Sequence, residues 1–213
     1  FISSWCSSYA LGKTGGMLSR THPNMMSQDS LIPSVSQWKI ISCQESEGIR
    51  SFPILHNNSD VVLNIGGALA PFDISTNPER GNGRSLLLKL PAIWEASFEQ
   101  LDALLVKLVS NDSQRFFGSK LSEDDVQARY KSITKKNGTY PRNLKVKLRS
   151  GYHACRFWDS DRQAMEQPSD FSQNTYNVIV KLRALWVTSE AWGIVCDATD
   201  FQQSDGMLVD CPF

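Results

Sequence analysis

The stretch from Asn177 to Phe201 constrains the fold more than any other part of this 213-residue chain. Its side chains alternate with a period of two, and one face of its first half holds Val178, Val180, Leu182, Ala184 and Trp186. Such alternation of β-branched and aromatic residues predicts a β-strand. A turn over residues 188–193, in which Gly193 is free to take a positive φ, would reverse the chain into a second alternating segment. We therefore expect a long β-hairpin at the centre of a sheet, with Trp186 in the core.

Shorter strands are predicted before this hairpin. Period-two segments bounded by Gly, Pro and Asn cover residues 37–43, 52–55, 61–65, 85–90, 144–148 and 151–158, with Gly66-Gly67 ending the third of these. An apolar stripe from Trp94 to Leu108 predicts a helix, and the capping-box spacing of Ser97 and Gln100 places its regular part from there. A second helix begins after Ser122, with three acidic residues in its first turn, and continues to about residue 135.

The order of these elements predicts the fold class. Strands do not alternate with helices, which argues against a parallel sheet. We expect a mainly β protein, an antiparallel barrel or sandwich with two helices inserted at about 94–135. The expected organisation is an extended N-terminal arm at 1–36, one β domain at 37–201 and a C-terminal tail at 202–213.

Cysteine usage and composition restrict the compartment. The five cysteines are widely spaced with no C-x-x-C pair, which indicates a reducing, intracellular location rather than secretion. No apolar run reaches the roughly 18 residues that a membrane-spanning helix needs. Residues 1–28 contain no Asp or Glu and are rich in Ser, as in an organelle transit segment, while a draped structural arm is the alternative.

Charge is distributed unevenly along a chain whose formal net charge is zero. Residues 113–162 hold 12 Lys and Arg against 5 Asp and Glu, whereas residues 163–213 hold 2 against 7. A basic middle followed by an acidic end is typical of an anion-binding surface with a competing tail, and equally of two solvated segments.

No strong catalytic or metal-binding motif is present. Gly12-Lys13-Thr14 resembles the end of a phosphate-binding loop, but Ser7 stands where that motif needs glycine. His153 and Cys155 share one face of a predicted strand, but nothing near them in the sequence supplies further metal ligands. We therefore predict a non-enzymatic protein that needs no metal and no cofactor.

Basic strand faces beside aromatic residues point instead to a binding function. Cations that follow phosphates and aromatic faces that stack on bases are what a binder of single-stranded nucleic acid requires. The predicted phosphate contacts are Lys145, Lys147, Arg149, Arg156, Lys181 and Arg183, and the predicted stacking residues are Tyr152, Phe157, Trp158 and Trp192. The alternative for the lysines is that they only keep an outer sheet face soluble. The alternative for the tryptophans is that they pack in the core.

Residues 85–201 resemble the single-stranded DNA-binding proteins of large DNA viruses and, more distantly, those of tailed phages. The resemblance lies in the segments 116–118, 140–148, 180–187 and 192–194. It implies an OB-like barrel interrupted by helices, non-sequence-specific binding of single-stranded DNA, and a location in a nucleus, viral factory or organelle. The end of the chain, through Asp210, Pro212 and Phe213, resembles the acidic Pro-Phe tip with which such binders recruit protein partners, although the tail here has few acids.

A second function stays open at this point. The same fold could serve as a structural or interaction subunit of a large assembly that has lost its nucleic-acid site. The long arm and the zero net charge are compatible with such a subunit, which would associate with other chains or with copies of itself. Strand order, oligomeric state and the choice between DNA and RNA do not follow from the sequence.

Overall fold

The predicted hairpin is the longest feature of the fold. A computed structural model describes residues 31–77, 83–136, 138, 140–151 and 154–204 of the chain. In it, strand β12 (Asn174–Val187) pairs antiparallel with β13 (Trp192–Gln203) along almost the full length of both strands. The prediction of a long hairpin is confirmed. Its connection is shorter than expected, because Trp192 and Gly193 already belong to β13.

Three further strands close a barrel on this hairpin. They are β4 (Ser59–Ala70), β6 (Gly83–Lys89) and β9 (Asn143–Leu148). Pairing runs from β12 to β4, β6, β9 and β13, and the β12–β13 hairpin closes the ring. Only the β9–β13 contact among these pairings is parallel. A five-stranded Greek-key barrel with this pairing order is the OB-fold, so the mainly β, OB-like prediction is confirmed.

The core lies inside this ring. Val178, Val180 and Leu182 of β12 are fully buried, as are Leu86 and Leu88 of β6 and Leu144 and Val146 of β9. The period-two pattern of each strand thus sends one set of side chains inward, as the alternation predicted. The outward set forms the surface on which a ligand could lie.

The inserted segment between β6 and β9 differs in part from its prediction. It contains α1 (Glu95–Asn111), preceded by a 3-10 turn at Ala92–Trp94, then α2 (Ser113–Phe117) and α3 (Glu123–Arg129). The described part of the insertion therefore contains three α-helices where two were expected. Helix α1 begins before the capping box at Ser97. The Ser122 cap is confirmed, since its hydroxyl accepts a hydrogen bond from the Asp125 N–H at 3.1 Å.

The last helix ends earlier than predicted because its continuation joins the sheet. Residues after Arg129 form two short strands, β7 (Tyr130–Lys131) and β8 (Thr134–Lys135). Strand β7 pairs parallel with the start of β13, and β8 pairs antiparallel with β9. Pairing with distant strands replaces the helical hydrogen bonds that the local sequence favours. This β7–β8 ribbon, residues 130–135, lies beside the barrel.

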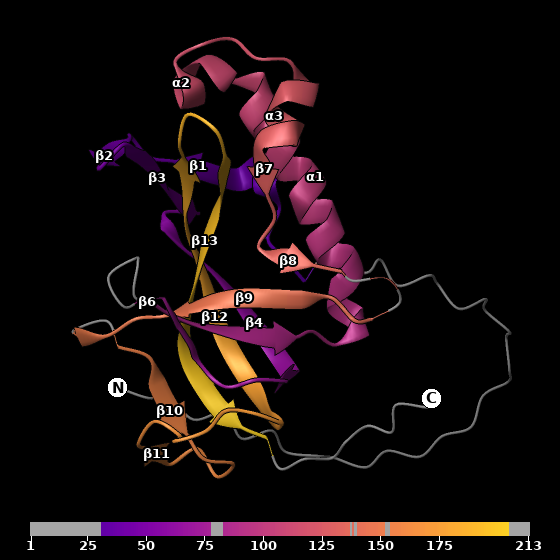
Figure 1. The fold of residues 1–213 in the computed structure, drawn as a ribbon, viewed down its shortest axis with the longest axis vertical. Helices are drawn as coiled ribbons and strands as arrows, with labels where there is room; N and C mark the ends of the chain where they lie inside the picture. Colours follow the sequence, from indigo (N-terminus) through magenta and orange to yellow (C-terminus); the bar gives the residue numbers. More distant parts are fainter. Residues whose placement is uncertain (1–30, 78–82, 137, 139, 152–153, 205–213) are drawn as a thin grey trace, which may run out of the picture.

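The remaining strands are peripheral. They are β1 (Trp38–Ile40), β2 (Gln44–Ser46), β3 (Ile49–His56), β5 (Ser75–Asn77), β10 (Arg156–Trp158) and β11 (Ala164–Met165), with a 3-10 turn at Val35–Gln37. Figure 1 shows the helices at one end of the β12–β13 hairpin and β10 and β11 at the other. Within the described residues, no helix is long and apolar enough to cross a membrane.

Two irregularities correct the sequence-based strand assignments. Gly66-Gly67 does not end β4; Gly67 takes a φ of +68°, and its N–H donates to the Asn177 side chain at 3.1 Å, opposite an irregularity in β12. A second irregularity lies in β12 between Leu182 and Ala184. A bulge adds one residue and exchanges the two faces of the strand beyond it. Leu185 and Val187 therefore enter the core, and Trp186 points outward, contrary to the prediction.

Candidate nucleic-acid interface

A groove of about 670 Å³ crosses the outer face of the barrel. Its floor comes from β6, β9 and the first half of β13. The end of β12, the β7–β8 ribbon and the loop between β4 and β5 contribute its other lining residues. Segments far apart in the sequence thus meet at one surface.

The two lysines of β9 point into this groove. Leu144, Val146 and Leu148 are buried, whereas Lys145 and Lys147 between them are exposed. The pleat of a strand sends alternate side chains to opposite faces, so the predicted alternation of β9 is confirmed. Strand β6 lies alongside, with Leu87 opposite Lys145 and Ser85 opposite Lys147.

The β7–β8 ribbon adds two more lysines, Lys131 and Lys135. The ribbon can approach β13 because Gly193 has no side chain; a Cβ there would lie 2.6 Å from the Lys131 carbonyl oxygen. The sequence suggested that Gly193 takes a positive φ, but it does not. Glycine is needed here because the ribbon approaches so closely. The same virtual atom would lie 3.0 Å from the Trp186 Nε1, so the indole also lies against this glycine.

A buried polar network holds the ribbon on helix α1. Asp102 accepts hydrogen bonds from the Tyr130 hydroxyl at 2.6 Å and the Ser132 hydroxyl at 2.8 Å. Arg142 donates to the Thr134 hydroxyl at 2.7 Å and to Glu99 at 2.8 Å. Burial raises the pKa of Asp102, and the two hydroxyl hydrogen bonds offset this only in part. The network fixes the backbone from which Lys131 and Lys135 project.

The groove carries an uncompensated positive charge. Its lining contains four lysines, at positions 131, 135, 145 and 147, and one carboxylate, Asp73. Within the described part of the chain, none of these lysines forms an ion pair or a side-chain hydrogen bond. Four ammonium groups without a protein partner make an anion-binding surface.

Two aromatic side chains border the lysines. Phe72, on the loop after β4, is 65% exposed, which is unusual for so large an apolar residue. Trp186 is half-buried at the end of β12 and lines the same groove. Both leave ring surface accessible beside the cations, as base stacking requires.

Three of the predicted cations are engaged by acids on the same outer face. Asp197 is 2% exposed and accepts a hydrogen bond from the Arg183 Nε at 2.8 Å, with the Arg149 Nη1 at 3.9 Å. Lys181 forms an ion pair with Asp60. Lys181 is therefore neutralised, and Arg149 and Arg183 share one carboxylate, whereas Lys145 and Lys147 have no acidic partner among the described residues.

Arg156 and Trp158 lie away from the groove, at the other end of β13. Strand β10 pairs parallel with β13 there, with Arg156 opposite Asp200 and Trp158 opposite Gln202. Both side chains donate hydrogen bonds to the Asp200 carboxylate, at 3.0 Å and 3.1 Å. The structure thus divides the predicted site residues between two places on the barrel.

Two predicted stacking residues belong to the core, which corrects their assignment. Trp192 is fully buried and donates from Nε1 to the Val126 carbonyl oxygen at 2.7 Å. Phe157 is 9% exposed and stacks on Phe201 with ring centroids 5.8 Å apart. A ring enclosed by protein has no face left for a base. Tyr152 and the tail residues Asp210, Pro212 and Phe213 lie outside the described residues.

Sequence reasoning missed Phe72, Trp186, Lys131 and Lys135 as groove residues. Phe72 lies in a polar loop, where a large apolar side chain is expected to be exposed. That expectation was the one signal in the sequence that could have identified it. Lys131 and Lys135 had been placed near the end of a helix, where cations suit the helix dipole. Their convergence depends on pairing of β7 and β8 with strands that lie far away in the sequence.

Reactive groups are not gathered elsewhere in the described residues. Within them, no three His, Cys, Asp or Glu side chains lie close enough together to hold a metal ion. His153, half of the pair considered from the sequence, lies outside the described residues. Burial raises the pKa of the Cys155 thiol to about 12, so it stays protonated and unreactive at neutral pH.

Comparison with known proteins gives similarity at the level of structure only. No family model and no curated sequence matches the chain. The structure is similar to that of the single-stranded DNA-binding protein from bacteriophage Enc34 in complex with single-stranded DNA, with a TM-score of 0.47 and 10% identity, covering 82% of this chain and 98% of the phage chain. A C-terminal truncation of the same phage protein gives a TM-score of 0.45 and 8% identity over the same shares of the two chains. Both structures are of a bacteriophage single-stranded DNA-binding protein, the class to which the sequence has its more distant resemblance.

Proposed function

We propose that this chain is a non-enzymatic protein that binds single-stranded DNA without sequence preference in the groove across β6, β9 and β13. One observation carries the proposal: four lysines that have no side-chain partner among the described residues lie in the same groove as Phe72 and Trp186. The lysines supply the phosphate contacts and the rings supply the stacking. The groove also lies on the second and third strands of the OB barrel, beside the loop between its first two strands, where OB-folds bind oligonucleotides.

The composition of the groove favours single strands over duplex. In a duplex the faces of the bases are covered by their neighbours, so exposed rings such as those of Phe72 and Trp186 gain contact only with unpaired bases. Among the described residues that line the groove there is no Arg, Asn or Gln, whose planar groups form paired hydrogen bonds with base edges. Its lysines are point charges on flexible stems, which suit phosphates. Lysine charges and ring faces accept any base.

Titration of fluorescein-labelled oligo-dT, followed by anisotropy, tests the proposal. We expect binding at low salt that weakens as salt is raised. If each of the four lysines neutralises one phosphate, the logarithm of the association constant falls against the logarithm of salt concentration with a slope of about −3. Unlabelled duplex of the same length should compete poorly, and oligo-rU in a parallel titration compares RNA with DNA.

Absence of binding at low salt would contradict the proposal. The barrel would then be a scaffold, as in the alternative of a subunit in a larger assembly, and size-exclusion chromatography with native extracts would be the next measurement. Binding that is equally tight at all salt concentrations would also contradict it, because four free ammonium groups could not then be the contacts.

Removal of either groove ring should weaken binding without unfolding the protein. We expect Phe72→Ala and Trp186→Ala each to cost about 1–3 kcal/mol of binding free energy, the range for loss of one stacked base. Tyr140→Ala is the matched control, because Tyr140 is 72% exposed but does not line the groove. Equal affinities for the groove variants and the Tyr140 variant would show that the rings do not stack on bases.

A further inference from the structure

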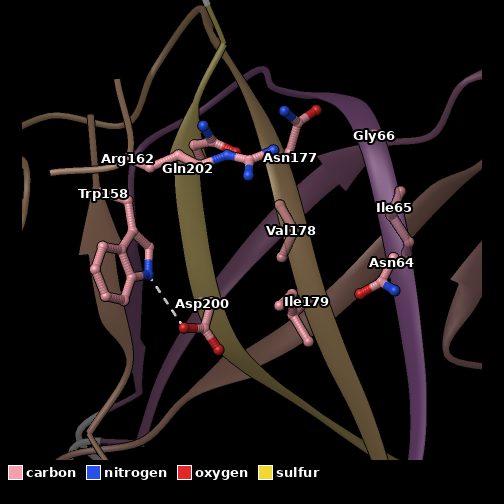
Figure 2. Close-up of a pocket in the computed structure, with 10 residues that line it drawn as sticks. All are labelled: Asn64, Ile65, Gly66, Trp158, Arg162, Asn177, Val178, Ile179, Asp200 and Gln202. Carbon is pink, nitrogen blue, oxygen red and sulfur yellow. Dashed lines mark hydrogen bonds between the residues drawn. The ribbon is translucent and has the colours of Figure 1, made fainter. Parts of the chain in front are cut away.

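A second pocket, of about 620 Å³, lies at the opposite end of the hairpin from the groove. Its side-chain lining comes from β4, β10, β12 and β13 and from the turn after β10, and Figure 2 shows the side chains arranged around it. The functional groups are those of Asn64, Trp158, Arg162, Asn177, Asp200 and Gln202. The volume is within the range of about 300–1,000 Å³ that is usual for small-molecule sites.

Trp158 forms a fixed wall of this pocket. Its indole Nε1 donates to the Asp200 Oδ1 at 3.1 Å, and the half-buried ring stands at one side of the pocket in Figure 2. Arg156 holds the same carboxylate, with Nε 2.8 Å from Oδ1. Burial would raise the pKa of Asp200, but hydrogen bonds from Arg156, Trp158 and Thr199, together with the charge of Arg156, outweigh burial and lower the pKa. Asp200 therefore stays charged at neutral pH and keeps the ring in place.

Several polar side chains around this ring have donors or acceptors that form no hydrogen bond within the described residues. Asn177 uses its carbonyl oxygen for the Gly67 N–H, and Gln202 uses its NH₂ group for the Ser160 carbonyl at 3.1 Å. The Asn177 NH₂ and the Gln202 carbonyl oxygen are left over, as a donor and an acceptor. Among the described residues, the side chains of Asn64 and Arg162 have no hydrogen-bond or ion-pair partner.

This set of groups matches a nucleotide. An unstacked base needs a rigid ring face and a mixture of donors and acceptors for its edge. Its phosphate needs a cation, which Arg162 can provide because the Asp200 carboxylate of the same pocket is already held by Arg156 and Trp158. The amides of Asn64, Asn177 and Gln202 distinguish this pocket from the groove, whose charged lining is four lysines and Asp73.

The pocket and the groove share one surface, the outer face of β13. Val195 lines the groove and Asp200 lines the pocket, five residues further along the strand. At about 3.3 Å per residue, the two sites are roughly 17 Å apart along the strand. Arg149 and Arg183 flank Asp197 between them, so the path from one site to the other is bordered by cations.

We propose that this pocket is a second base-binding site, in which a nucleotide of the same DNA strand places its base beside Trp158 after leaving the groove. The inference rests on the proposed function of the groove. It predicts that short oligonucleotides fill the groove alone, whereas longer ones reach both sites. The chemistry of the pocket also predicts a preference among bases at this one position, since its amides read base edges.

Comparison of two oligo-dT lengths separates the two sites. We expect Trp158→Ala and Arg162→Glu to leave the affinity for an oligonucleotide of about 4 nucleotides unchanged within two-fold, and to weaken that for one of about 15 nucleotides roughly ten-fold. Within the described residues the Arg162 side chain forms no hydrogen bond and no ion pair, so Arg162→Glu tests the pocket even if Trp158→Ala disturbs the fold. Lys107→Glu is its matched control, because Lys107 is exposed on α1 and lies in neither site.

Each outcome decides one proposal. If the pocket variants lose the same affinity for both oligonucleotide lengths, or lose none for either length, the second site is overturned. The proposal for the groove is then unaffected. Failure of the wild-type protein to bind the short oligonucleotide would instead overturn the groove. Photocrosslinking with a single iodouracil moved along the longer oligonucleotide adds a direct measurement: we expect one position to crosslink to Trp158, and crosslinking of Trp158 at every position or at none would contradict a defined pocket.

Discussion

Replacement of Lys145 and Lys147 together by glutamate is expected to abolish binding of oligo-dT while the barrel stays folded. A pair of unit charges about 4 Å apart contributes about 1 kcal/mol in a water-like environment, so reversal of one lysine costs about 2 kcal/mol. The two reversals together correspond to roughly a 1000-fold increase in Kd. The measurement is fluorescence anisotropy at low salt, with circular dichroism to follow folding.

Stability should hardly change in this variant. Both side chains are exposed on the outer face of β9 and form no ion pair within the described residues. Surface substitutions of this kind usually alter the free energy of unfolding by less than about 0.5 kcal/mol. A Lys107→Glu/Lys120→Glu variant carries the same change in net charge on exposed positions outside the groove. If it loses as much affinity as the groove variant, the effect is one of net charge and the site assignment is wrong.

Replacement of Trp192 by alanine is expected to destabilise the fold strongly. The indole is fully buried, packs on Tyr130 with ring centroids 4.5 Å apart, and joins β13 to the middle of α3 through the Val126 carbonyl. Truncation of a buried tryptophan costs about 3–5 kcal/mol of unfolding free energy. For a chain of this size that corresponds to a fall in Tm of roughly 10 °C, measured by thermal or urea unfolding.

Trp186→Ala is the matched comparison for this second experiment. Its ring is half-buried on the outer face, so its loss should reduce DNA affinity more than stability. The two tryptophans lie close together in the hairpin, because Trp186 pairs with Gly193 and the next residue, Val187, pairs with Trp192. If instead Trp192→Ala lost affinity and kept its stability, Trp192 would be a stacking residue as the sequence had indicated.

Several elements follow from local pattern alone, and the structure confirms them. The hairpin is predictable because β-branched and aromatic residues alternate along both of its strands. The inward and outward sides of β9 follow from Leu and Val alternating with Lys, and the start of α3 follows from Ser122 and the acids after it. Each of these signals depends on residues within a few positions of one another.

The site could be predicted only in part. Lys145 and Lys147 were identified from the alternation of one strand. Trp186 was expected in the core, but the bulge in β12 exchanges the faces of the strand and leaves no mark in the sequence. Trp192 was expected in the turn, but it starts β13 and packs against α3 and Tyr130. Arg149 and Arg183 were expected to be free cations, yet both meet Asp197, which comes from the neighbouring strand.

The β class of the fold, the central hairpin and the basic outer face of β9 can be read from the sequence, because alternation with the strand pleat is a local property. Which charges and rings share a surface depends on how distant strands pair. Phe72, Lys131 and Trp186 meet Lys145 because closure of the barrel brings separate strands and loops into one groove. Trp158 lines a second pocket because β10 pairs with the far end of β13. Pairing partners and bulges depend on contacts across the whole chain, and they place residues that local periodicity cannot.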